Sequence, residues 1–97
     1  MSILTICKNS LAHMNTILRR TPPNKWIRIN ATNSVCNDIR YEIHPTIEEP
    51  EQFDKILQEK VPVYICGKSL PYIIGLELRW IEDVFGARIR FQFKNMT

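Results

Sequence analysis

Apolar and polar residues alternate in four stretches of this chain, and the stretches come in two closely spaced pairs. In the first pair, residues 25–32 are followed by residues 39–44 after a polar segment. In the second pair, residues 76–81 are followed by residues 89–93, with Gly86-Ala87 at the turn. Alternation with a period of two places successive side chains on opposite faces of a β-strand. The pattern therefore predicts two antiparallel hairpins.

The segment before the first hairpin has the repeat of a helix. Its apolar residues recur every three or four positions, which is one face of an α-helix: Cys7, Leu11, Met14 and Leu18. Thr5 can cap the start of this helix, and Pro22-Pro23 stops it. His44-Pro45 is expected to end the second strand of the first hairpin.

Shorter elements are expected between the two hairpins. Residues 53–57 and 61–66 predict short strands, and Ser69–Ile74 predicts a short helix capped by Ser69 and ended by Gly75. The fold class is therefore α+β, with a mixed, mainly antiparallel sheet, one N-terminal helix and a short second helix.

Length and composition fit a single domain over residues 1–97. Apolar residues make up 44% and charged residues 24%, which is ordinary for a globular protein. We expect an intracellular protein with free thiols and no membrane span, because neither an export signal nor a long apolar run is present. The cytosol and the mitochondrial matrix both remain open.

The net charge of +3 is spread along the chain, and no dense basic cluster stands out. Nucleic-acid binding is therefore a minor hypothesis, resting on arginines at strand positions: Arg28, Arg40, Arg79, Arg88 and Arg90. Neither His13 nor His44 is spaced to pair with a cysteine thiol, so we expect no enzymatic activity.

The segment from Lys68 to Asn95 resembles a signature of the A-type iron–sulfur carriers, the IscA/HesB group. That family typically reads V-D-P-K-S-L-x-Y-L-x-G-x-x-I-D-Y-V-E-D-L-x-G-x-G-F-x-F-x-N-P-N. The residues in register are Lys68, Ser69, Leu70, Tyr72, Gly75, Glu82, Asp83, Gly86, Phe91, Phe93 and Asn95. The resemblance implies a HesB-like domain over nearly the whole chain.

The resemblance also implies where iron or a cluster would be held. Cys36 lies where the family places the cysteine of its G-G-C-S-G loop, although Ser34, Val35, Asn37 and Asp38 replace the glycines and the serine of that loop. The family's C-terminal C-x-C-G tail has no counterpart in the sequence. Cys66 stands where the family usually has aspartate and is a second candidate for assisting a metal.

Two hypotheses of function follow from the resemblance. In the first, a dimer brings two Cys36 loops together to hold iron or an iron–sulfur cluster loosely and pass it to apo iron–sulfur proteins. A cluster normally needs about four thiolate ligands, so the site would be a degenerate one. In the second, the chain is a pseudo-carrier, a structural or interaction subunit of a larger assembly with no bound cofactor, and Cys36 is a surface cysteine without a role.

Overall fold

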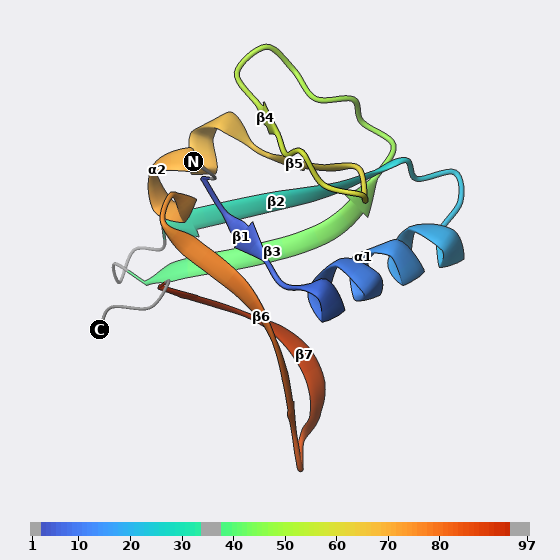
Figure 1. Cartoon of the computed structure of the whole chain (residues 1–97). Helices are drawn as coiled ribbons and strands as arrows, with labels where there is room; N and C mark the ends of the chain where they lie inside the picture. Colours follow the sequence, from blue (N-terminus) through green and yellow to red (C-terminus); the bar gives the residue numbers. More distant parts are fainter. Residues whose placement is uncertain (1–2, 34–37, 94–97) are drawn as a thin grey trace.

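The computed structural model describes residues 3–33 and 38–93 (Figure 1). The elements, in chain order, are β1 (Thr5–Ile6), α1 (Lys8–Arg20), β2 (Trp26–Asn33), β3 (Ile39–Thr46), β4 (Lys55–Ile56), β5 (Val63–Ile65), a 3-10 turn η1 (Gly67–Ser69), α2 (Leu70–Ile73), β6 (Leu76–Asp83) and β7 (Gly86–Phe93). The α+β class is confirmed, with α1 and the short α2 at the expected places.

The strands form two sheets. One has four strands in the order β3-β2-β5-β4, and the other has three in the order β1-β6-β7. Three strand pairs are antiparallel, namely β2–β3, β4–β5 and β6–β7. Two pairs, β1–β6 and β2–β5, are parallel. The sheets are therefore mixed and mainly antiparallel, as predicted, and both expected hairpins are present.

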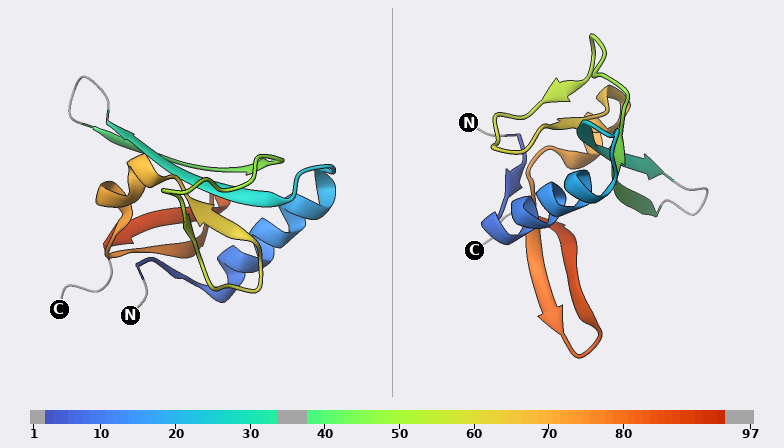
Figure 2. Two further views of the ribbon diagram at one scale, coloured as in Figure 1. Left: turned by 90° about the horizontal axis from the view of Figure 1, so that it is seen from above. Right: turned by 90° about the vertical axis from the view of Figure 1, so that its right-hand side faces the viewer.

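The core lies between the four-stranded sheet on one side and α1 with the three-stranded sheet on the other (Figure 2). In β2, Ile27, Ile29 and Ala31 point into this core, so the alternating side chains Arg28 and Asn30 lie on the outer face. Met14 of α1 is fully buried against the same core. The period-two pattern thus decided which face of β2 meets the core.

The hairpin of β6 and β7 extends beyond the body of the molecule (Figures 1 and 2). Val84 and Phe85 form its tip, with 93% and 91% of their surfaces exposed. The turn, Val84-Phe85, is therefore two residues earlier than the predicted Gly86-Ala87. Gly86 begins β7 with a φ of +115°, a left-handed conformation that glycine adopts at little cost.

The start of the chain and the end of β3 also differ from expectation. Thr5 belongs to a strand, β1, and Cys7 is the residue that precedes α1. Pro45 does not end β3, which continues to Thr46. Proline is tolerated there because β3 is at the edge of its sheet, where one side of the strand needs no partner for its N–H groups.

Ser69 has a different role from the predicted helix cap. No cap bond joins its side chain to α2 in the part of the chain that the structure describes. Its buried hydroxyl instead accepts a hydrogen bond from the Ala31 N–H at 2.8 Å and donates one to the Ala31 carbonyl at 3.1 Å. Since β5 ends at Ile65, the Ser69 hydroxyl continues the hydrogen bonding of β2 beyond the end of β5.

Candidate functional site

Cys36, the first candidate ligand, lies outside the described residues, as does Asn95 of the signature segment. The structure does define the ends of the loop to which Cys36 belongs. Asn33 ends β2 and pairs with Ile39, the first residue of β3. The cysteine therefore belongs to the connection of the β2–β3 hairpin, as the alternating pattern predicted.

The start of β3 lies close to the last described part of the chain. The rings of Tyr41 in β3 and Phe91 in β7 stack with their centroids 4.6 Å apart. Ile39 is two residues before Tyr41, and Phe93 is two residues after Phe91. The two strands that lead to the Cys36 connection and to the C-terminal segment are thus joined by an aromatic contact.

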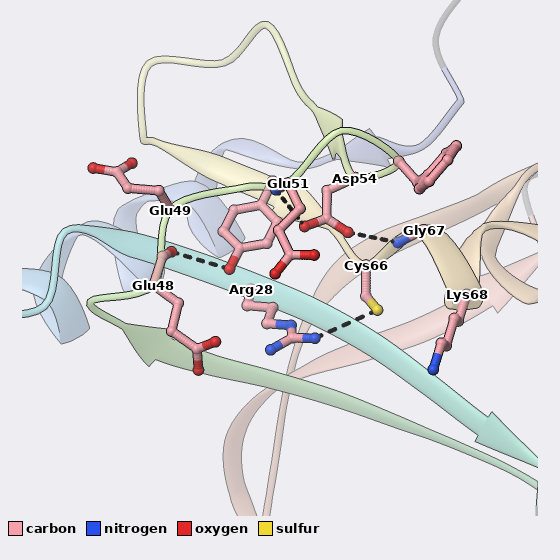
Figure 3. Close-up of a pocket in the computed structure, with 10 residues that line it drawn as sticks. Arg28, Glu48, Glu49, Glu51, Asp54, Cys66, Gly67 and Lys68 are labelled. Carbon is pink, nitrogen blue, oxygen red and sulfur yellow. Dashed lines mark hydrogen bonds between the residues drawn. The ribbon is translucent and has the colours of Figure 1, made fainter.

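Cys66, the second candidate, follows β5 and faces a cavity on the outer side of the four-stranded sheet. A guanidinium N–H of Arg28 donates to its sulfur at 3.4 Å (Figure 3). The Cys66 backbone N–H donates to the carbonyl of Ile29 at 3.1 Å, which fixes the cysteine beside the middle of β2. The thiol is half-buried.

The electrostatics around Cys66 favour its thiolate. Burial by itself raises the pKa of the Cys66 thiol. The hydrogen bond from Arg28, a backbone hydrogen bond from Lys68 and the charge of Arg28 together lower it by more than burial raises it, so the pKa lies below its ordinary value. The same contact raises the pKa of Arg28. Burial raises the pKa of Tyr64. A cation that donates to sulfur stabilises the charged form of a cysteine.

An acidic segment between β3 and β4, with Glu48, Glu49, Glu51 and Asp54, covers this site and is held by hydrogen bonds. The Tyr64 hydroxyl donates to the Glu48 carbonyl at 3.1 Å. Asp54 accepts from the Gly67 N–H at 2.9 Å and from the Glu51 N–H at 2.8 Å. Gly67 must be glycine here, because a Cβ would lie 2.5 Å from the carbonyl oxygen of Phe53.

The structure fixes the position of Cys66 relative to the end of β2, after which the Cys36 connection begins. Cys66 is beside Ile29, and β2 continues for four more residues to Asn33. At about 3.3 Å per residue, that separates Cys66 from the start of the Cys36 connection by about 13 Å. Cys36 itself lies outside the described residues, and the metal role of Cys66 stays a prediction.

The other candidate groups have structural partners. Cys7, expected in the core, is half-buried, with its sulfur 3.1 Å from the Ser10 hydroxyl. The His13 ring packs on Trp80 at 5.1 Å, and His44 Nε2 is 3.1 Å from the Asn30 amide nitrogen. Within residues 3–33 and 38–93, no group of three His, Cys, Asp or Glu side chains is arranged to hold a metal ion.

Two residues of the Cys66 site were not identified as such from the sequence. The sequence marks Arg28 only as one of several strand arginines, and it gives no local signal that Asp54 belongs to this site. The period-two pattern placed Arg28 on the face opposite Ile27 and Ile29. Its partner Cys66 could not be read from that pattern, because it depends on the parallel pairing of β2 with β5.

Comparisons with known proteins agree with this fold. No protein-family model matches the chain. Iron-sulfur assembly protein 1 of Saccharomyces cerevisiae is 34% identical over 95 residues, which are 97% of this chain and 36% of the yeast protein. The chain thus spans about a third of the length of that relative. The iron-binding protein IscA of Salmonella arizonae is 27% identical over 93 residues, 95% of this chain and 84% of IscA.

Solved structures show the same fold. The crystal structure of Escherichia coli SufA, involved in biosynthesis of iron–sulfur clusters, has a TM-score of 0.77 at 16% identity, covering 93% of this chain and 79% of SufA. A crystal structure of IscA with the [2Fe-2S] cluster has a TM-score of 0.74 at 23% identity, covering 95% of this chain and 86% of IscA. The chain belongs to the A-type iron–sulfur carrier, or HesB-like, family.

In the part of the structure that is described, no helix is long and apolar enough to cross a membrane.

Proposed function

We propose that this chain acts in iron–sulfur cluster assembly as a carrier, and that Cys36 supplies the thiolate that holds its cargo. The supporting observation is the similarity over nearly the whole chain to proteins described as an iron–sulfur assembly protein and an iron-binding protein. The hairpin of β2 and β3 carries a cysteine in its connection, which is where the family resemblance places the first ligand.

The cargo would be held loosely. Each chain brings one Cys36, so two chains bring two thiolates, whereas a stable cluster normally has about four ligands. A cluster with fewer protein thiolates exchanges ligands more easily. Thiolates of an apo-protein can then replace those of the carrier one at a time, which is the step that a carrier has to permit.

Anaerobic reconstitution with iron and sulfide tests the proposal. Iron per chain and the visible absorption of the cluster are measured for the wild type, Cys36→Ser and Cys7→Ser. Cys7 is the matched control, because its thiol contacts Ser10 at the start of α1. We expect Cys36→Ser to lose most of the bound iron and Cys7→Ser to keep it.

Two outcomes would overturn the proposal. If Cys36→Ser binds as much iron as the wild type, Cys36 is not the ligand. If the wild type binds no iron and is isolated with a stable protein partner, the chain is a pseudo-carrier within a larger assembly. Cys66→Ser in the same series tests the second candidate ligand, and a loss of iron in that variant alone would replace Cys36 by Cys66.

A further inference from the structure

A cavity of about 270 Å³ lies on the outer side of β2 and β5, next to the acidic segment between β3 and β4. Arg28, Tyr64 and Cys66 come from the sheet, and Gly67 and Lys68 come from the turn after β5. The cavity is beside the middle of β2, about 13 Å from the end of the strand. Its described lining contains Cys66, so a role for this cavity can be tested separately from cargo held at Cys36.

The nucleophile in this cavity is the Cys66 sulfur. In Figure 3 it points toward the Arg28 guanidinium, which donates to it at 3.4 Å. A thiolate is the reactive form of cysteine, and a neighbouring guanidinium stabilises it. Cys7, by contrast, has a hydroxyl as its side-chain partner.

The cavity wall also holds hydrogen-bonding capacity that the described protein atoms do not use. The Nε of Arg28 is buried and has no hydrogen-bond partner among the described residues. Buried polar atoms in folded proteins nearly always have partners, so an orphan donor on a residue that lines the cavity favours a polar occupant.

Charge around the cavity selects the kind of occupant. Four carboxylates line it against two cationic side chains, Arg28 and Lys68. In Figure 3 the Glu51 carboxylate lies over the same space as the Cys66 sulfur, whereas Glu49 points away. Glu49 instead accepts a hydrogen bond from the Trp26 indole. A cleft with an excess of carboxylates concentrates cations and repels anions.

We propose that Cys66 is a thiol modification site that reacts with small disulfides bearing ammonium groups and discriminates against anionic disulfides. The Cys66 thiolate attacks one sulfur of the reagent, and the bond between the two reagent sulfurs breaks. A new bond then joins Cys66 to the attacked sulfur, and the other half leaves as a thiolate that takes a proton from water. The disulfide itself is the oxidant, so no further redox partner is needed.

Three dialkyl disulfides of similar size test this proposal: cationic cystamine, neutral 2-hydroxyethyl disulfide and anionic 3,3′-dithiodipropionate. The rate constant at Cys66 is followed by mass spectrometry of its peptide. Each value is divided by that of N-acetylcysteinamide with the same reagent, which removes differences in leaving group. We expect the normalised rate for cystamine to exceed that for dithiodipropionate about tenfold, and the ratio to shrink in ~1 M salt.

Variants separate the two parts of the site. Glu51→Gln should reduce the preference for cystamine, while Glu59→Gln, an exposed carboxylate outside the cavity, should not change it. Arg28→Gln should slow all three reagents and move the inflection of the pH–rate profile to higher pH. Thermal unfolding of each variant shows that the chain is still folded.

The proposal is wrong if Cys66 reacts no faster than the reference thiol with cystamine. It is also wrong if the normalised rates do not depend on reagent charge, or if Glu51→Gln and Glu59→Gln behave alike. The reaction is measured without iron, so its failure leaves the role of Cys36 untouched, and a loss of iron binding in Cys36→Ser leaves Cys66 untouched.

Discussion

Cys7 and Cys66 are both half-buried cysteines with a hydrogen-bonding partner, yet their surroundings give them different properties. Cys7 precedes α1, where its sulfur contacts the Ser10 hydroxyl and its N–H donates to the Leu78 carbonyl. Cys66 contacts a guanidinium and faces a cavity. The two cysteines thus share residue type, burial and a pKa below the ordinary value, and they differ in the charge of the side-chain partner and in the cavity that Cys66 faces.

The largest expected difference is in the unfolding free energy lost when each of two buried serines, Ser69 near Cys66 and Ser10 near Cys7, is replaced by alanine. Ser69→Ala leaves the N–H and carbonyl of Ala31 without the hydroxyl that now satisfies both, which should cost about 2 kcal/mol of unfolding free energy. Ser10→Ala removes a long 3.5 Å bond to Leu78 and the 3.1 Å contact with the Cys7 sulfur, but it adds a better helix former, so it should cost less than about 1 kcal/mol. Urea unfolding of both variants measures the difference, and equal losses would contradict it.

Replacement of cysteine by serine should change the stability of the chain in opposite directions at Cys7 and at Cys66. Within the described residues, Cys7 makes no side-chain cap bond to the start of α1. Cys7→Ser supplies a favoured cap residue and should stabilise the chain by about 0.5–1 kcal/mol.

Cys66→Ser replaces the sulfur that accepts from Arg28 with a smaller group and should destabilise the chain by about 1 kcal/mol. Differential scanning calorimetry of the two variants beside the wild type compares them directly. A loss of stability in Cys7→Ser would show that Cys7 is held by packing and not by its place before the helix.

The smallest expected effect is a pH dependence of stability at Cys66. The pKa of its thiol is lowered on folding from an ordinary value of 9.0, so the folded chain releases this proton at lower pH than the unfolded chain. The stabilisation is complete above the unfolded pKa and is lost as pH falls through the folded pKa.

The gap in unfolding free energy between wild type and Cys66→Ser should therefore widen as pH rises from about 7 to about 9. Chemical denaturation across this range measures the gap. In an Arg28→Gln background the widening should be much smaller, because the cation that lowers the pKa is gone. A gap that stays constant with pH in the wild type would contradict the assignment.

Local patterns in the sequence predicted much of the fold. Alternation identified both hairpins and the buried face of β2, because a strand with one face in the core needs an apolar residue at every second position. The helical repeat located α1. The local reading was wrong at Thr5, at Pro45 and at the turn before Gly86, because in each case a strand extended further than propensity suggested. Pairing with a neighbouring strand outweighed the local preference there.

The candidate site also has one part that the sequence predicts and one part that it does not. Cys36 could be assigned to a hairpin connection from the sequence, and the family resemblance then supplied its expected role. The Cys66 site could not be assembled from the sequence, since Arg28 and Cys66 are separated by 37 intervening residues and meet only through the β2–β5 pairing. Nothing in the local pattern of either segment indicates a parallel neighbour.

The sequence by itself determined the order of the elements after β1, the two hairpins and the face that β2 turns to the core. These follow from period and from turn residues, which act over a few positions. Only the tertiary structure decided that β2 and β5 lie parallel, that the Ser69 hydroxyl completes the bonding of β2, and that Arg28 meets the Cys66 sulfur beneath an acidic segment. Those contacts depend on how distant segments pack around one core, and packing is a property of the whole chain.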